Sequence, residues 1–160
     1  MSPLDLRRVM GHFATGVAVV TALDAGGVPV GTTVNAITSV SLQPPLVLVC
    51  LDLNSATLRA VKDHGAFAIN VLGAEHRHLA HGFAKQGALK PWHAAHHHPG
   101  ATGTPRLEAA LAALECRVED RLTAGDHELV VGRVVAAEVG EAEAGPLLFY
   151  RGDYSSLGGP

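Results

Sequence analysis

The sequence predicts a mainly β fold, a small antiparallel barrel with a few peripheral helices. Short runs of apolar and β-branched residues recur along the 160-residue chain, separated by turns or by short helical segments. The helical segments are too few to cover both faces of a parallel sheet, and no strand–helix–strand unit is repeated. We therefore expect seven or eight strands that form one barrel. No internal repeat or linker divides the chain, so residues 1–160 are expected to be a single domain.

The first expected element is a helix over residues 4–13. One face of this helix is apolar at helical spacing, and its members are Leu6, Val9, Met10 and Phe13. Ser2 and Pro3, which precede it, are typical of a helix start.

A β-hairpin follows this helix. Residues 16–23 form its first arm, residues 24–27 (DAGG) its turn, and residues 28–33 its second arm. Pro29 predicts a sheet edge or a bulge at the start of the second arm, because proline has no backbone N–H to donate.

A strand and a short helix are expected next. Residues 46–51 are continuously apolar, as in a strand that is buried on both faces. Residues 55–63 predict a helix, with Asn54 or Ser55 as its N-cap and Gly65 just past its end.

The chain then continues with a strand over residues 66–72 and a helix over residues 75–84, on which Leu79 and Phe83 lie on one side. Glycine, proline and histidine dominate residues 85–104. This composition predicts a long irregular loop or lid.

Only strands are expected in the last part of the chain. Residues 114–122 alternate in polarity, which predicts a strand with one buried and one exposed face. The inward set is Leu114, Cys116, Val118 and Leu122, and the outward set is Glu115, Arg117, Glu119 and Arg121. A turn over residues 123–127 leads to a long strand over residues 129–139, and residues 147–150 form the last strand.

Composition limits the classes of function. Hydrophobic residues make up 48% of the chain and charged residues 17%, so we expect a second subunit to cover apolar surface, in a two-fold homodimer. The net charge of −3 and the lack of a lysine/arginine run exclude a nucleic-acid partner. No apolar run is long enough for a membrane-spanning helix, and residues 1–10 lack the apolar region of a signal peptide. A cytoplasmic protein without a membrane partner is expected.

The cysteines and histidines do not predict a metal site. Cys50 and Cys116 stand far apart, each in an apolar run, as reduced buried thiols do. Ten histidines include a loop group at residues 93–98, but no HExxH or CxxC framework accompanies them, and a solvated loop also tolerates histidine. The sequence also contains no GxSxG, GxGxxG or GxxxxGK[ST] motif.

Small polar side chains are densest in residues 31–57 (GTTVNAITSVSLQPPLVLVCLDLNSAT). If residues 33–41 are extended, alternate side chains share one face of the strand. That face is formed by Thr33, Asn35, Ile37, Ser39 and Ser41. Two interpretations remain open: a solvent-exposed edge strand, or a polar wall for a ligand with several hydrogen-bonding groups.

A second polar group, NSAT at residues 54–57, opens the expected helix. A helix start suits a phosphate, because its backbone N–H groups are free and it carries partial positive charge, and the hydroxyls of Ser55 and Thr57 can add hydrogen bonds. Ordinary helix capping explains the same residues without a ligand. The short distance along the chain between the two polar groups favours a ligand that has a ring and a phosphate.

His127 follows Gly125 and Asp126 at the start of a predicted strand. An imidazole in this position can hydrogen-bond a second ligand or stack on a ring, although Gly-Asp is also an ordinary turn. Residues 150–154 (YRGDY) place Arg151 between two tyrosines. This pattern fits a ligand site, and it fits core tyrosines beside a surface arginine equally well.

Together these residues resemble the flavin reductase family with the FMN-binding split-barrel fold, the small reductase components of two-component flavin monooxygenases. Five segments carry the resemblance in order over nearly the whole chain: FATGVAVVTA (residues 13–22), residues 31–57, GAFAINVL (65–72), PRLEAALAALEC (105–116) and GDHELVVGRV (125–134). The resemblance implies a homodimeric Greek-key split barrel that carries FMN or FAD. NADH or NADPH would reduce this flavin by hydride transfer, and the reduced flavin would leave for a flavin-dependent oxygenase.

The resemblance also implies roles for individual residues. The isoalloxazine ring and ribityl chain would be bordered by Thr33, Val34, Asn35 and Ala36, and from the neighbouring strand by Cys50, Leu51 and Asp52. The phosphate would lie near Ser39, Ser41, Ser55 and Thr57. His127 resembles the family histidine implicated in nicotinamide binding. Because hydride transfer is the cofactors' own chemistry, His127 is expected to bind and orient rather than to donate a proton.

The family pattern T-A-N-S-F reads T-V-N-A-I here over residues 33–37, and two of the departures matter, Ala36 and Ile37. Ala36 lacks a serine hydroxyl, which removes one potential flavin hydrogen bond of about 1 kcal/mol. Ile37 replaces a phenylalanine and alters the packing beside the ring. We expect looser flavin binding or a changed preference between FMN and FAD, without loss of the site.

Two other functions are compatible with the same sequence. One is a flavoprotein of the same fold that reduces another acceptor, such as a corrinoid or a small organic molecule. The other is a non-catalytic module that binds flavin or haem, in which the histidine-rich segments would matter more.

Overall fold

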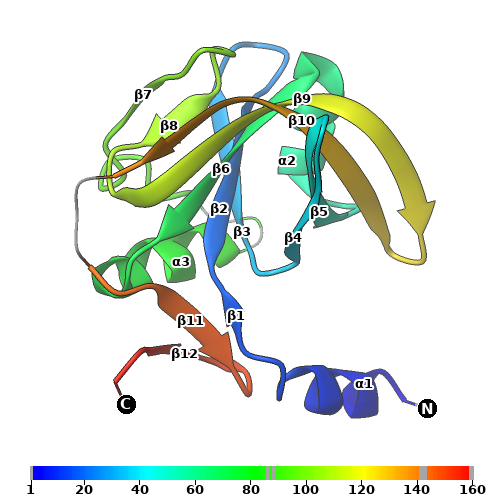
Figure 1. Cartoon of the computed structure of the whole chain (residues 1–160), viewed down its shortest axis with the longest axis vertical. Coiled ribbons are helices and arrows are strands. Elements are labelled where there is room, and N and C mark those ends of the chain that lie inside the picture. Colours follow the sequence, from blue (N-terminus) through cyan, green and yellow to red (C-terminus); the bar gives the residue numbers. More distant parts are fainter. Residues whose placement is uncertain (1, 86, 88, 141–143, 159–160) are drawn as a thin grey trace.

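The computed structural model describes residues 2–85, 87, 89–140 and 144–158, and strands dominate it, as the sequence predicted (Figure 1). The strands are β1 (Thr15–Gly16), β2 (Ala18–Leu23), β3 (Pro29–Val34), β4 (Ile37–Leu42), β5 (Pro45–Asp52), β6 (Ala66–Leu72), β7 (His97–Pro99), β8 (Pro105–Leu107), β9 (Ala110–Ala124), β10 (His127–Val139), β11 (Leu147–Tyr150) and β12 (Asp153–Ser156). The helices are α1 (Pro3–Met10), α2 (Ala56–His64) and α3 (Arg77–Ala84), and α3 follows a 3-10 turn, η1 (Ala74–His76). No helix in the described part of the chain is long and apolar enough to cross a membrane.

The main sheet contains seven strands in the order β3-β2-β6-β9-β10-β5-β4, and all its neighbouring strands are antiparallel. β9 and β10 form one long curved hairpin that runs across the molecule (Figure 1). The two edge strands, β3 and β4, are joined only by Asn35 and Ala36. At this junction the Cys50 N–H donates a hydrogen bond to the Ala36 carbonyl, with an N···O distance of 3.1 Å. The curled antiparallel sheet is the split barrel that the sequence predicted, and Pro29 lies on its edge strand.

Two apolar clusters lie on opposite faces of β2. Val20 belongs to the first cluster, together with Leu58 and Val61 of α2. Val19, the next residue toward the N-terminus, belongs to the second cluster, which includes Leu79 and Phe83 of α3. Alternation along one strand thus fixes α2 and α3 on opposite sides of the sheet.

α2 has the ends that the sequence predicted. Ser55 is its N-cap, and the Ser55 hydroxyl accepts hydrogen bonds from the N–H groups of Thr57 and Leu58. Gly65 ends the helix with φ of 71°, a left-handed conformation that glycine adopts without strain. The cap therefore fixes where the start of α2 meets the end of β5.

α1 lies apart from the barrel, beside the small sheet β1-β11-β12 (Figure 1). It begins with a capping box between Ser2 and Asp5, and no residue of this helix is buried. The Arg151 N–H donates to the Gly11 carbonyl at 2.7 Å, which ties the β11–β12 turn to the end of α1. The helix ends at Met10 and is shorter than the predicted segment.

The expectation of one extended strand over residues 33–41 is wrong. β3 ends at Val34, and β4 begins at Ile37 on the other edge of the main sheet. Thr33 and Ser39 consequently belong to different strands and do not share a face. The continuously apolar strand is also not fully buried on both faces, because Val47, Val49 and Leu51 are buried whereas alternate residues are half-buried.

Two expectations about β9 are wrong as well. Glu115 is only 2% exposed, although it lies on the predicted outward face, and Leu122 is 63% exposed, although it belongs to the predicted inward set. The Thr102 N–H and hydroxyl reach the Glu115 carboxylate, so a loop covers that face. Leu122 lies in the outer part of the long hairpin, where β9 residues from Glu119 onward are exposed.

Three short strands differ from the prediction. β7 lies within the expected irregular loop and pairs with β8, and β12 pairs with β11. Strands of three or four residues are too short to show a reliable polarity pattern.

Candidate functional site

A large cleft opens between β3, the end of β5 and the start of α2, with a volume of about 780 Å³. The predicted site residues that line it are Thr33, Val34, Asn35, Ala36, Cys50, Leu51, Asp52, Ser55, Thr57 and His127. Antiparallel pairing of β10 with β5 places His127 opposite Asp52, and α2 follows β5 after a short turn. Three segments that are distant in sequence therefore meet in one place.

Ser39 and Ser41 are not among the residues that line the cleft. They lie on β4, where Ser39 pairs with Val47 and Ser41 with Leu46 of β5. Ser39 is exposed and Ser41 is half-buried. The chain turns at Asn35 and Ala36, so β4 leads away from the cleft rather than continuing its wall.

Two cations, Arg59 and Lys90, also line the cleft. The sequence did not predict either of them as a site residue. The Arg59 guanidinium donates to the Asn54 carbonyl at 3.1 Å, and Lys90 Nζ donates to the Phe83 carbonyl at 2.8 Å. Desolvation lowers the pKa of Lys90 from its ordinary value. Arg59 was recognisable, because it follows Ser55 by four residues and so lies one helical turn further on. Lys90 belongs to a loop, and no local pattern marks it.

One end of the cleft has the chemistry of an anion site. Ser55 Oγ accepts two backbone hydrogen bonds, which leaves its own hydrogen free to donate. The positive end of the α2 dipole and the charges of Arg59 and Lys90 lie along the same cleft. This donor set suits a phosphate group.

The other part of the cleft wall is uncharged apart from Asp52. The Thr33 hydroxyl donates to the Ala80 carbonyl at 2.7 Å, so it is already held toward α3. Asn35 and Ala36 are exposed at the cleft surface. Burial raises the pKa of the half-buried Cys50 thiol, which therefore stays protonated and neutral at pH 7. Such a wall suits a planar, largely uncharged ring.

His127 is held by its neighbour Asp126. His127 Nδ1 lies 2.7 Å from Asp126 Oδ1. The hydrogen bond from His127 is the largest of the effects that lower the pKa of Asp126, so this carboxylate is ionised and accepts the proton of Nδ1–H. The Nε2 atom of the ring is left for a ligand. The Leu53 N–H also donates to the Asp126 carbonyl at 3.0 Å, which ties this turn to the end of β5.

The described residues hold no group of three or more histidine, cysteine, aspartate or glutamate side chains that is arranged to bind a metal ion. The residues of the cleft do fit a flavin nucleotide. Its wall can border the ring, and its hydrogen-bond donors and cations can hold the phosphate.

Comparison with known protein families gives one match over most of the chain. A model described as "Flavin reductase like domain" matches residues 10–158. The chain belongs to the flavin reductase family. The resemblance inferred from the sequence is thereby confirmed.

Individual relatives in this family are similar over nearly their whole length. The reductase component of a 4-nitrophenol 4-monooxygenase/4-nitrocatechol 2-monooxygenase from Rhodococcus opacus is 45% identical over 157 residues, which cover 96% of this chain and 82% of the relative. An NADH:riboflavin 5'-phosphate oxidoreductase from Streptomyces pristinaespiralis is 38% identical over 161 residues, which cover 96% and 88%. The structure of an NADH:FAD oxidoreductase from Streptomyces globisporus, in complex with NAD and FAD fragments, matches with a TM-score of 0.87 at 35% identity and covers 95% of this chain and 90% of that one.

Proposed function

We propose that this member of the flavin reductase family is an NAD(P)H:flavin oxidoreductase that reduces FMN or FAD and supplies the reduced flavin to a partner monooxygenase. One observation carries the proposal: the edge strand β3, the start of α2 and His127 line the same cleft. Bound flavin supplies the redox chemistry, since it accepts a hydride from NAD(P)H. The relatives, which include a monooxygenase reductase component, support the same function.

We assign the two ends of the cleft to two parts of the flavin. Residues 33–36 and 50–52 border the ring and the ribityl chain, and Ser55 and Thr57 hold the phosphate with Arg59 and Lys90. The walls position the ring, and the cations neutralise the phosphate. Ala36 offers no side-chain hydrogen bond to the ring, which favours loose binding.

His127 orients the nicotinamide. With Nδ1 engaged by Asp126, the ring presents Nε2 to the nicotinamide amide group, which both donates and accepts hydrogen bonds. Its role is to hold the donor carbon of the coenzyme against the flavin, because hydride transfer depends on distance and orientation. No acid or base on the protein is needed for this step.

A diffusible-flavin reductase has to release its product. A micromolar flavin dissociation constant corresponds to about −8 kcal/mol, which is tight enough for loading and weak enough for release. The open position of Asn35, Ala36 and Asn54, all exposed at the cleft, agrees with exchange of the flavin with solution.

The protein is a homodimer in this proposal. α1 exposes large apolar side chains, and a helix of eight residues is marginal unless its apolar face is covered. The exposed residues of this face are Leu6, Val9, Met10 and, just beyond the helix, Phe13. A second copy of the chain would cover them. The two free cysteines fit a cytoplasmic location.

Oxidation of NADH and of NADPH, measured with and without added free FMN or FAD, tests the proposed function. We expect flavin to stimulate oxidation of at least one coenzyme. Turnover only with another acceptor, such as a corrinoid, would point to the same fold with a different substrate. No oxidation with any acceptor would point to a non-catalytic binding module.

A further inference from the structure

Glu128 is a buried carboxylate to which the proposed function gives no role. It follows His127 directly in β10 and is only 3% exposed. Side chains alternate along a strand, so Glu128 points to the opposite face from His127, the face that carries the core residue Val130. An apolar residue would fill this position without burying a charge, and a buried charge loses its hydration. A carboxylate here therefore needs a reason other than packing.

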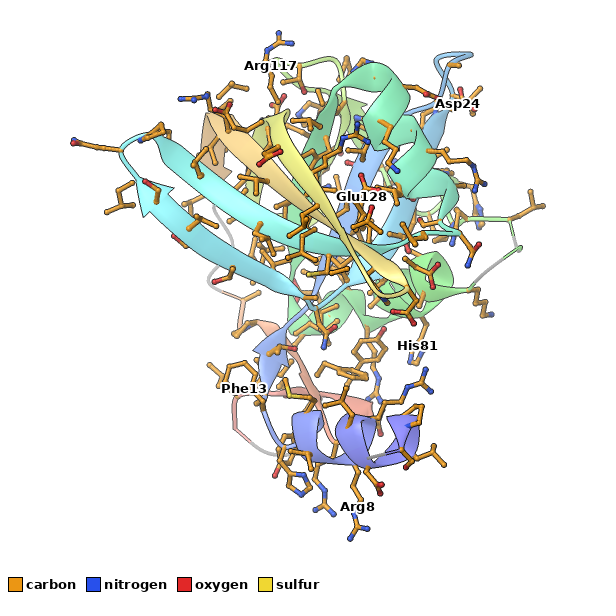
Figure 2. The ribbon with its side chains drawn as sticks, turned by 90° about the vertical axis from the view of Figure 1, so that its right-hand side faces the viewer. Arg8, Phe13, Asp24, His81, Arg117 and Glu128 are labelled. Atoms are coloured by element: carbon orange, nitrogen blue, oxygen red, sulfur yellow. The ribbon has the colours of Figure 1, made fainter. Side chains whose placement is uncertain are left out.

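Two cations on two different elements meet Glu128. Lys62 Nζ of α2 lies 2.5 Å from Glu128 Oε2, and Arg121 Nη1 of β9 lies 3.1 Å from Glu128 Oε1. Figure 2 labels Glu128 between α2 and the β9–β10 hairpin. The contact with Arg121 stays within the hairpin, because β9 and β10 are its two arms. The contact with Lys62 joins the hairpin to α2.

His127 lies at the end of the hydrogen-bonded ladders of β10. Its pairs with Asp52 of β5 and with Ala124 of β9 are the terminal pairs of the two ladders. The ends of strands open more easily than their centres. The ladders alone therefore hold the backbone of His127 less firmly than they hold the rest of β10.

Both sequence neighbours of His127 are fastened to the corner where β5 leads into α2. On one side, the Leu53 N–H donates to the Asp126 carbonyl at 3.0 Å. On the other side, Glu128 forms its ion pair with Lys62. This corner carries the start of α2, where the flavin phosphate is held in the proposed function. The two contacts thus hold the start of β10 against the segment that holds the phosphate.

We propose that Glu128 is a positioning residue for His127, an inference that rests on the proposed function. The ion pair with Lys62 fixes the start of β10 against α2, so the imidazole stands at a defined distance from the flavin that the same helix holds. Coenzyme binding depends on this distance, because the nicotinamide has to meet both His127 and the flavin ring. An ion pair with a buried partner contributes little net stability over an apolar contact, whereas it can select one arrangement of the elements that it joins.

Lys62→Met tests this role, because it removes the contact with α2 and leaves Glu128 its ion pair with Arg121. We expect the KM for NADH to rise about threefold, less than the rise expected for loss of the imidazole itself, while the FMN dissociation constant stays unchanged. Glu128→Gln is expected to raise the KM as well. The matched control is Glu119→Gln, which breaks an exposed ion pair with Arg133 in the same hairpin and is expected to leave the KM unchanged.

A double-variant cycle with His127→Ala shows whether the ion pair acts through the imidazole. In the His127→Ala protein, we expect Lys62→Met to raise the KM for NADH no further. A further threefold rise in the double variant would overturn the proposal. A loss of stability in urea with an unchanged KM would overturn it too, because that is the result for an ion pair with a structural role alone.

Hydrogen exchange at the Leu53 amide separates this inference from the enzymatic activity. This amide donates to the Asp126 carbonyl next to His127, so its exchange rate reports whether the start of β10 stays fastened. We expect faster exchange in Lys62→Met than in the wild-type protein and in Glu119→Gln. Unchanged exchange refutes the fastening even if NADH is oxidised. Faster exchange in a protein that oxidises neither coenzyme supports the fastening, and in that case the proposed function fails.

Discussion

His127 carries the most specific residue-level assignment, and its position depends on two neighbours. Asp126 Oδ1 accepts a hydrogen bond from His127 Nδ1–H, with an N···O distance of 2.7 Å. The register of β10 on β5 places His127 opposite Asp52. The imidazole is therefore fixed in tautomer and in place at the edge of the cleft. In the proposed function, we expect this residue to affect coenzyme binding more than flavin binding.

Replacing His127 with alanine is predicted to raise the KM for NADH about tenfold, the effect of one lost hydrogen bond, and to change flavin affinity less. Steady-state kinetics together with a separate flavin titration measure the two effects. Asp126→Asn keeps the imidazole but loses its carboxylate partner, so a smaller rise in KM is expected. Collapse of flavin affinity in His127→Ala would instead place this side chain against the flavin.

Arg59 allows a test of which end of the cleft holds the phosphate. Arg59→Gln is predicted to weaken FMN binding about tenfold and to leave riboflavin binding unchanged, because riboflavin has no phosphate. Fluorescence titration with each flavin gives both dissociation constants, and Arg117→Gln serves as the charge-matched control. Equal weakening of both flavins would contradict the assignment of the phosphate to the start of α2.

The sequence predicted half of the residues that line the cleft, for physical reasons that also explain the residues it missed. Ser55 was found because a cap is a local feature that the sequence shows directly. Alternation along one strand placed Ser39 and Ser41 on the same face as Thr33 and Asn35, and the turn at residues 35–36 breaks that alternation. Lys90 was missed because only the folded loop brings it to the cleft.

At the level of elements, the loop that carries Thr102 is attached to β9 through the buried carboxylate of Glu115. Burial, the largest single effect, acts to raise the pKa of Glu115. Hydrogen bonds from Thr102 and from the backbone of Ala101, with the charge of Arg106, outweigh it, so the pKa lies below its ordinary value. The folded state therefore binds the Glu115 proton less tightly than the unfolded state, and the ionised form stabilises the fold.

Glu115→Ala is predicted to lower the free energy of unfolding by about 3 kcal/mol at neutral pH, because it leaves the Thr102 N–H without its buried acceptor and removes the negative charge near Arg106. The stabilisation from Glu115 is fully present above the ordinary glutamate pKa and is lost as the pH falls through the lowered pKa of the folded state. Urea unfolding of both proteins across this acidic range measures the difference.

Glu119→Ala is the matched control for this experiment. Glu119 lies on the same strand, but its ion pair with Arg133 is exposed, so a much smaller loss of stability is expected. Equal losses for the two variants, or a Glu115 effect that does not depend on pH, would contradict the role given to the buried carboxylate.

Elements with strong local signals were predicted nearly residue by residue. β6 has the predicted limits of residues 66–72, and α2 lies between its predicted caps. The misses have tertiary causes. Glu115 reads as an exposed residue until a distant loop covers it, and Leu122 reads as buried although the hairpin extends past the core. The residue pattern of β9 shows neither the loop that covers Glu115 nor the point at which the hairpin leaves the core.

For the whole molecule, the proposed homodimer rests on the exposed apolar face of α1. Val9 is 66% exposed and Phe13 is 69% exposed in the single chain. α2 and α3 cover the core of the barrel. The apolar face of α1 is therefore not needed to bury the core of a single chain. A two-fold dimer is the simplest arrangement that buries it.

Val9→Glu is predicted to shift the protein from dimer to monomer, because it places a charge in the apolar interface. Sedimentation velocity at several protein concentrations measures the change. Leu42→Glu is the control, since Leu42 is 85% exposed but lies on β4, away from α1. A dimer that persists in Val9→Glu and dissociates in Leu42→Glu would place the interface on the barrel edge instead.

The most direct test of the account is anaerobic mixing of the protein with NADH and excess FMN, followed by the absorbance of oxidised flavin. We predict catalytic loss of that absorbance, with one flavin reduced per NADH consumed, and a slower rate in Arg59→Gln at low FMN. NADH consumption without flavin reduction, or reduction no faster than in the absence of the protein, would contradict the central claim that this cleft brings coenzyme and flavin together.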